Sequence, residues 1–593
     1  MTAVTVPRVQ LRPRFPCAYN PRKQGTHPMR SLTRFTSTLL LTSCLTLPLL
    51  GCADDIAVAE GETATTAAAV CRGGATTMPL FKDLGTHEHK ITTTSPQAQA
   101  YFNQGYRLLF NFNHAGAIAS FQEALKRDPK CAMCWWGIAF AHGPNINMPM
   151  MPDAMLPAWQ ALQMAQSLKA NASPAERDYI DALAKRYAEK PPEDRSPLDR
   201  AFAGAMRDIA KKYPNDMDAQ TLYAESLMDT SPWNYWQTDR KTPNAGLEDL
   251  APTLEAVLAK APDHPGAIHL YIHAVEVPFP KKAEKAADRL TTMLPGAGHL
   301  VHMPSHIYNR IGRYDDSVEW NKKAAKADEA YFAATGDRGM YAAMYYVHNL
   351  HFVWTAAMTE GRSATAFEFG KAVVDRADPQ TARAIPGIEV FVPTLTYAHL
   401  RFGKWDDILA AKAPDPELHL ATAMHHYARA RAFAAKGNVK QAKAEQAQIV
   451  KSFNAEDDTR FSNFGVPGRQ MVTIANYVAE ADIALAQREL KVAIAKLQSA
   501  VKAQDQLPYM EPPYWDFPTR QYLGAALLQA NQAKQAEKVY RADLNEWTRN
   551  GWSLFGLSES LKRQGKNREA SEAKQAFLEA WSRADVDLKE SRF

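Results

Sequence analysis

The chain has 593 residues, of which 46% are apolar and 22% charged, the usual balance of a globular protein. The formal charge of +5 is small for this length, and basic and acidic residues alternate, which argues against the concentrated basic face of a nucleic-acid-binding protein. No glycine-rich phosphate loop is evident in the sequence, and alanine and leucine outnumber valine and isoleucine, which favours helices.

The N-terminal segment predicts export. Residues 1–28 look like an upstream extension, and residues 29–52 have the order of a signal peptide: two early arginines, then an apolar run too short and too interrupted to span a membrane. The run ends in Leu-Leu-Gly-Cys, which resembles the lipobox of bacterial lipoproteins. This resemblance implies that Cys52 receives the lipid; an ordinary cleaved signal is the alternative.

The residues after Cys52 predict where the protein is anchored. Ala53 stands where some lipoproteins carry the aspartate that retains them in the inner membrane, so the resemblance implies a lipid anchor in the outer membrane, facing the periplasm. Residues 53–79 contain few large apolar side chains and are predicted to form a flexible tether. Export also implies an oxidising compartment.

Residues 98–131 carry the pattern of a helix–turn–helix repeat. Small and apolar residues lie at offsets 4, 8, 11, 20, 24, 27 and 32, namely Tyr101, Gly105, Leu108, Ala117, Phe121, Ala124 and Pro129. This spacing resembles the 34-residue tetratricopeptide repeat (TPR). Further units are predicted from 132 and from near 217, 265, 298, 347, 389, 423, 474, 517 and 549.

The predicted fold is therefore all-α, an α-solenoid of TPR units. One helical pair cannot bury its apolar stripe alone, so neighbouring pairs must stack. We expect an N-terminal array over 80–374, which carries a histidine-lined groove, and a C-terminal array over 375–593. Insertions are predicted at about 144–216, 230–250 and 329–346.

Two cysteines, Cys131 and Cys134, lie at the junction of the first two units. Thiolates and the thioethers of nearby methionines are soft ligands that suit Cu(I). However, one such pair is weak evidence for a metal, and core packing or a local disulfide is the favoured interpretation.

Histidines recur at fixed repeat positions in the middle of the chain. Offsets 2, 5, 9 and 12 of successive first helices hold Glu225, His269, His273, Glu276, His299, His302, His306, His348 and His351. At about 100° per residue these offsets point away from the core offsets 4, 7, 8 and 11. The residues are therefore predicted to line the concave groove and not the helix-packing core.

A ladder of imidazoles on one groove predicts a metal site, because such groups repel one another when protonated and lose hydration when packed. The predicted ligands are His269, His273, His302, His306, His351 and Glu276, with Glu225, His299 and His348 as further groove-lining residues. The expected ion is a divalent transition metal, zinc first, with copper or iron as alternatives. A groove for peptides or small anions, or a structural histidine network, would also explain the ladder.

Five longer motifs resemble a group of exported bacterial TPR proteins: KCAMCWWGIAFAHGPNINMPM, HPGAIHLYIHAVE, GHLVHMPSHIYNRIGRYDD, YYVHNLHF and EPPYWDFPTR. The resemblance implies fold and export but no catalytic role. The chain departs from the group at His87-Glu88-His89, where a more apolar residue is expected after the histidines. The EPPYW segment cannot be helical through its prolines, and its aromatic residues are predicted to cover one end of the groove or to pack.

The function predicted from these features is metal handling, or metal-assisted ligand binding, by an envelope lipoprotein. Its partners would be the membrane, through the lipid, and a peptide or protein in the groove, with no nucleic acid. A metal-dependent enzyme that uses Glu225 or Glu276 as base is one alternative. A metal-free scaffold for protein–protein interaction is the other.

Overall fold

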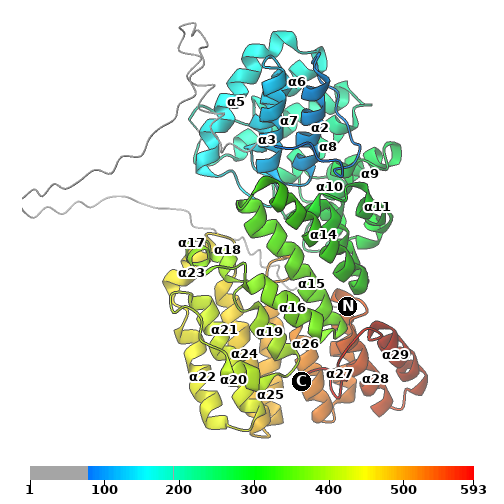
Figure 1. Cartoon of the computed structure of the whole chain (residues 1–593). Helices are drawn as coiled ribbons and strands as arrows, with labels where there is room; N and C mark the ends of the chain where they lie inside the picture. The colour runs from blue at the N-terminus through cyan, green and yellow to red at the C-terminus, as the bar shows by residue number, and fades with distance from the viewer. Residues whose placement is uncertain (1–77, 191) are drawn as a thin grey trace, which may run out of the picture. The chain divides into compact units, whose positions relative to one another are not determined.

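The computed structural model describes residues 78–190 and 192–593. The signal peptide, Cys52 and the tether as far as residue 77 lie outside the described residues. Within this part of the chain all regular structure is helical, and only isolated bridges such as Asn145–Met148 have strand-like pairing (Figure 1). No helix among the described residues is both long and apolar enough to cross a bilayer.

The helices as far as the end of the histidine-rich segment are α2 (Pro96–Phe110), α3 (His114–Arg127), α4 (Ala132–Ala141), α5 (Met155–Leu168), α6 (Pro174–Leu183), α7 (Ser196–Lys212), α8 (Met217–Asp229), α9 (Leu250–Lys260), α10 (Pro265–Val275), α11 (Pro280–Met293), α12 (Gly298–His302), α13 (Pro304–Ile311), α14 (Tyr314–Thr335) and α15 (Val347–Glu360). Short turns of other helix types are η1 (Pro152–Ala154), η2 (Lys169–Asn171) and the π-helical η3 (Ala342–Tyr346).

The remaining helices are α16 (Ser363–Val374), α17 (Pro379–Ala384), α18 (Pro386–Glu389), α19 (Thr394–Arg401), α20 (Trp405–Ala410), α21 (His419–Ala435), α22 (Val439–Lys451), α23 (Ala455–Ser462), α24 (Gly468–Ala486), α25 (Leu490–Gln504), α26 (Thr519–Gln529), α27 (Ala533–Glu546), α28 (Gly551–Arg563) and α29 (Asn567–Ala580).

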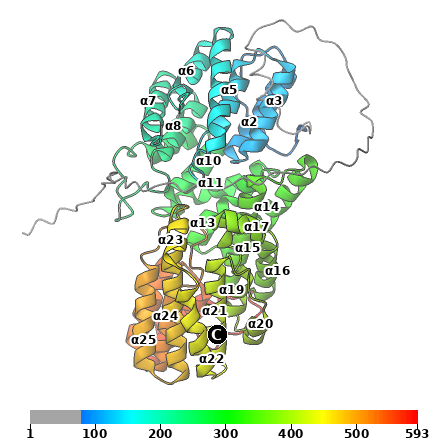
Figure 2. The ribbon, with the colours of Figure 1, turned by 90° about the vertical axis from the view of Figure 1, so that its left-hand side faces the viewer.

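Successive helices pack in pairs, which confirms the predicted α-solenoid of TPR-type units. Helix α2 packs on α3, α10 on α11, α15 on α16 and α24 on α25 (Figure 2). Most predicted unit starts fall within a few residues of the first helix of a pair, such as 298 at α12 and 549 at α28. The predicted insertion at 144–216 is itself helical, since α5 packs on α4 and α6 and α7 continue the stack to α8.

Glycine ends two first helices at the same repeat position. Gly312 follows α13 with φ +82°, and Gly361 follows α15 with φ +75°, both in the left-handed region that L side chains disfavour. A Cβ at Gly361 would also lie 2.3 Å from the ring of Trp581. Each glycine thus turns the chain from the first helix of a unit into the second.

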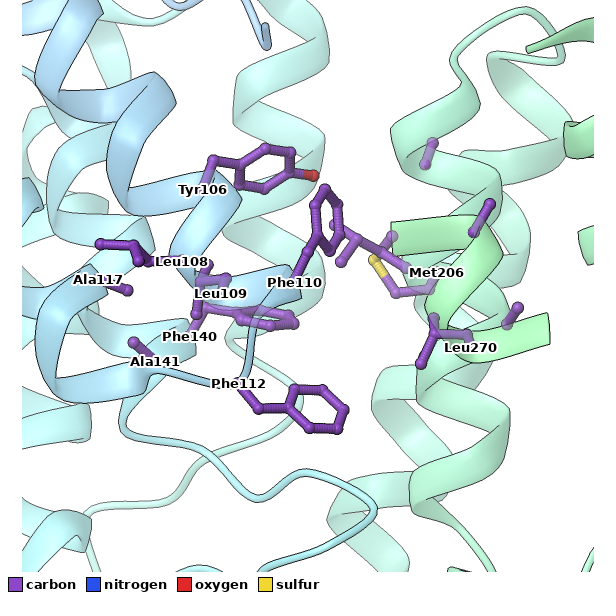
Figure 3. Packing of buried hydrophobic residues seen from close by; sticks show 14 of the residues in the cluster. Tyr106, Leu108, Leu109, Phe110, Phe112, Ala117, Phe140, Ala141, Met206 and Leu270 are labelled. Carbon is purple, nitrogen blue, oxygen red and sulfur yellow. The ribbon is translucent and has the colours of Figure 1, made fainter. Parts of the chain in front are cut away.

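Buried apolar side chains form two large clusters along the described chain. One extends from Leu84 to Tyr345 and the other from Tyr314 to Ala573. In the first cluster, Phe110 and Phe112 at the end of α2 are directed toward α10, which carries Leu270 (Figure 3). This contact between segments far apart in sequence brings the end of α2 over the histidine ladder.

Candidate metal centre

Six of the seven ladder histidines come together in two groups. The first triad is His269, His273 and His299, and the second triad is His302, His306 and His348. Within each triad, one ligand atom per residue lies within 4.8 Å of the others. Helix α10 supplies two members, α12 and α13 supply three, and α15 supplies His348. His299 and His348, predicted only to line the groove, are thus members of the cluster.

The ladder lies on the predicted helix face, but this face is covered, contrary to the expectation of an open groove. The five histidines on α10, α12 and α13 are each at most 3% exposed. Phe112 covers the first triad, with ring centroids 4.3 Å from His269 and 5.6 Å from His299. Phe352 covers the second triad, 4.5 Å from His302. Aromatic side chains from the turn after α2 and from α15 therefore convert a groove into an interior site.

Hydrogen bonds fix the tautomers of two neutral histidines. His269 Nδ1 lies 2.6 Å from the carbonyl oxygen of Phe110, which can only accept, so Nδ1 carries the proton. His302 Nδ1 lies 2.6 Å from Asn321 Oδ1. The amide nitrogen of Asn321 donates to the carbonyl oxygen of Ser317 at 2.7 Å, so its oxygen must accept from His302. Each neutral imidazole therefore has its lone pair on Nε2.

Glu276 lies between the two triads and faces one histidine of each. Its Oε1 is 3.5 Å from His273 Nδ1, and its Oε2 is 2.8 Å from His306 Nδ1, a close contact without hydrogen-bond angles. Burial raises the pKa of Glu276, but His306 and His273 outweigh this effect and hold the pKa at about 2. The ionised carboxylate thus keeps the Nδ1 proton on both imidazoles, as outer-shell carboxylates do at metal sites.

The first triad contains four buried imidazole nitrogens without a hydrogen-bond partner: His269 Nε2, His273 Nε2, and both ring nitrogens of His299. Burial, reinforced by repulsion from neighbouring histidines, lowers the pKa of His269 and His299 well below the ordinary value. These imidazoles are therefore neutral at physiological pH. Buried lone pairs without partners are costly, and a metal ion would satisfy them.

Besides Glu276, two residues that were predicted to line the groove lie outside the triads. His351 stacks on Trp354, and its Nε2 is 3.9 Å from Asp516 Oδ1, while burial lowers its pKa to about 3. Glu225 is buried where Asp229 is its charged neighbour, and burial together with Asp229 raises its pKa to about 8. The structure does not bring either residue into the histidine cluster.

Neither the repeat pattern nor the histidine ladder predicts the residues that border the cluster near Glu276. Trp233 lies 5.0 Å from the His273 ring and 6.2 Å from Tyr509, measured between centroids, and it is 36% exposed with φ +62°. Tyr509 donates to Glu511 Oε1 at 3.0 Å. The segment around Glu511 thus borders one end of the site, whereas Trp515, one of the aromatic residues predicted to cover the groove or to pack, packs on Tyr427 in the core.

The two cysteines form a disulfide and are buried. Cys131 also caps α4, since its sulfur accepts a hydrogen bond from Cys134 N at 3.0 Å. The structure therefore agrees with the disulfide interpretation of this pair.

Replacing Cys131 and Cys134 together by serine is expected to leave bound metal unchanged, because neither residue belongs to a histidine triad. Metal analysis of the purified double variant, with circular dichroism as the control for folding, tests this expectation. Loss of metal from a folded double variant would contradict it.

A second polar cluster surrounds Asp218, and we call it the Asp218 cluster: Asp218, His87, His89 and His264. Asp218 Oδ1 lies 3.0 Å from His87 Nε2 and from His264 Nε2, and Oδ2 lies 2.7 Å from His89 Nδ1. His264 Nδ1 accepts from Ala267 N at the start of α10, so its Nε2 carries the proton. Unlike the first triad, these nitrogens have partners.

No protein-family model matches this sequence, and no curated protein matches it. Among solved structures, human IFIT1 bound as a dimer to m7Gppp-AAAA is similar at 13% identity and a TM-score of 0.32, over 82% of this chain and 90% of that one. Yeast Tom70 is similar at 11% identity and a TM-score of 0.27, over 83% and 91% of the two chains. Similarities this distant do not bear on function.

Proposed function

We propose that the protein is a transition-metal-binding helical-repeat lipoprotein of the bacterial envelope, and that the first triad holds an ion. The observation that carries the proposal is the set of four partnerless nitrogens on three buried, neutral histidines. An apolar core would not collect such groups, because each leaves a desolvated lone pair.

The donor set favours zinc, with copper or iron as alternatives. All six ladder donors are imidazoles, which suit zinc, copper and iron, and no thiolate belongs to either triad. Three imidazoles leave one position of a four-coordinate ion open for water or a ligand. Metal handling and metal-assisted ligand binding both use such a position.

An enzyme that uses the predicted acidic bases is less well supported. Both oxygens of Glu276 face imidazoles, so the carboxylate is engaged in orienting them. Glu225 lies outside both triads. Neither group is placed to take a proton from water on an ion in the first triad.

Metal analysis of the full-length protein, purified without a chelator or a histidine tag, tests the proposal. We expect a stoichiometric transition metal that a strong chelator removes and added Zn²⁺ restores. His269→Phe should abolish binding at the first triad and retain an aromatic ring beside Phe112. A protein that contains no metal and takes up none at neutral pH would refute the metal site and favour a peptide-binding groove.

Cys52→Ser is expected to release the protein from membranes or to leave it unprocessed, because the Leu-Leu-Gly-Cys junction resembles a lipobox, in which the cysteine receives the lipid. Membrane fractionation and intact mass of the mature protein measure both effects. Cys71→Ser, a change in the same segment after the lipobox, is the control. Unchanged fractionation and mass in Cys52→Ser would rule out lipid attachment there.

A further inference from the structure

We infer that the second triad binds a second metal ion, so that the histidine cluster is a dinuclear centre. This inference rests on the proposed function of the first triad and adds to it a site formed by His302, His306 and His348. The two sites would share one carboxylate, Glu276, as the positioning group of one histidine in each.

A cation is needed between His302 and His306. Their Nε2 atoms lie 3.0 Å apart, and the Nδ1 proton of neutral His302 is fixed by Asn321, so a lone pair of His302 faces His306. The Nδ1 of His306 faces the Glu276 carboxylate and therefore carries the proton of the neutral ring. The lone pair of neutral His306 is then on Nε2, which faces His302. Two lone pairs at this distance repel unless a proton or a metal ion lies between them.

A metal ion can bind all three histidines of the second triad, whereas a proton can satisfy only two of them. A proton on His306 Nε2 would satisfy His302 and His306 but would not engage His348, whose ring centroid lies only 4.6 Å from His302 and 5.7 Å from His306. His348 belongs to the same 4.8 Å group as His302 and His306, so one of its ring nitrogens lies close enough to share an ion with theirs. One ion can accept all three nitrogens.

One ion cannot serve both triads. Zinc–nitrogen bonds are about 2.0–2.1 Å long, so the donors of one ion lie within roughly 4.2 Å of one another. Among the described residues, groups that meet even a 4.8 Å limit contain three members each, and none joins all six histidines. A single ion would therefore leave the lone pairs of the other triad without a partner.

Glu276 gives the two sites a common support. Through Oε1 it faces His273 of the first triad and through Oε2 His306 of the second, so the Nε2 atoms of both histidines are left for ligation. A rival arrangement would place one ion directly on Glu276, His273 and His306, which also form a group within 4.8 Å. The rival predicts one ion in total, so stoichiometry separates the two arrangements.

The test is the number of ions bound by the full-length protein after chelator treatment, reloading with Zn²⁺ and removal of the excess. We expect about two zinc ions per chain. His299→Phe and His348→Phe should each retain about one, and the double variant none. Phenylalanine keeps the aromatic contacts, and at His299 it removes no hydrogen bond of a ring nitrogen. Circular dichroism and the visible spectrum of Co²⁺-loaded protein report on folding and coordination.

Two control variants exclude other sites. His425→Phe changes a histidine that contacts His426 outside the cluster, and Asp218→Asn changes the other histidine-rich group; both should retain two ions. One ion in the unaltered protein would overturn the dinuclear centre but not the proposed function, and none would overturn both. Two ions that persist in His348→Phe, or fall to one in Asp218→Asn, would also overturn the second site.

Discussion

Glu276→Gln is expected to weaken metal binding by about 10–100-fold, the usual effect of losing an outer-shell carboxylate. The carboxylate faces the Nδ1 atoms of two imidazoles with an oxygen each, whereas an amide has one accepting oxygen and one donating nitrogen. Either His273 or His306 must then face an N–H group. That histidine would move its proton to Nε2, which is the atom needed for the metal.

Competition with a chromophoric chelator measures this effect, with the free energy of unfolding of the metal-free protein measured alongside. Glu225→Gln is the matched control, because that buried carboxyl has a pKa raised to about 8 by burial and belongs to no group with the ladder histidines. Unchanged affinity in Glu276→Gln would show that Glu276 does not position the ligands. Complete loss of one ion at saturating metal would instead indicate direct coordination by Glu276.

Repeat phase was enough to predict which helix face carries the histidines. Offsets 5 and 9 lie one turn apart, and the pairs His269–His273 and His302–His306 do share a face, with ring centroids 5.0 and 4.9 Å apart. The fold was predictable for the same reason, since the small and apolar offsets of each unit describe contacts between neighbouring helices.

In the unit that starts near residue 347, repeat phase does not predict which histidine joins the cluster. His351 has the same offset as His302, yet His348 joins the cluster and His351 faces Asp516. The π-helical turn η3 directly precedes α15, so the helix that carries His348 and His351 begins differently from α10 and α12. No composition signal marks such a turn.

The repeat pattern also did not predict which residues cover the site. Phe110, whose carbonyl oxygen fixes the tautomer of His269, lies 159 residues away in sequence. Trp233 contacts His273, and Tyr509 lies near Glu276; both residues come from segments between the predicted units. Such contacts depend on how distant segments fold back on the array, which a nearest-neighbour repeat does not encode.

Asp218→Asn is expected to destabilise the N-terminal part of the array by on the order of 3 kcal/mol, the range for removing one member of a buried charged pair. Burial raises the pKa of Asp218, but hydrogen bonds from His264, His87 and His89 outweigh it and hold the pKa well below the ordinary value. The carboxylate is thus ionised and accepts from three imidazoles. The amide of asparagine has only one accepting oxygen and no charge. Its NH₂ group would face an imidazole N–H group, so that two donors would lie against each other.

The segment that carries His87 and His89 should become less stable when the Asp218 carboxylate is lost. Its backbone is held to α2 by His89 N–H, which donates to Asn103 Oδ1 at 3.2 Å, and by Ile91 N–H, which donates to Gln99 Oε1 at 3.0 Å. Hydrogen exchange at these two amides should accelerate in Asp218→Asn, whereas Asp208→Asn, a change at an exposed ion pair, should leave it unchanged. Unchanged exchange and unfolding midpoint would show that the Asp218 cluster does not hold the segment.

The contact between His89 and Asp218 predicts that the stability of this segment falls as pH rises, which is opposite in sign to ordinary acid unfolding. Burial lowers the pKa of His89, but the hydrogen bond to Asp218 and its charge outweigh burial, so the folded pKa is raised above the unfolded value of about 6.5. A raised histidine pKa means that the stabilisation is complete below about pH 6.5 and is lost as pH rises through the folded pKa. Exchange at His89 and Ile91, corrected for its intrinsic pH dependence, should therefore become faster as pH rises above about 6.5. In Asp218→Asn this acceleration should disappear, because the charge that raises the pKa of His89 is gone; if it persists, another group holds the His89 proton.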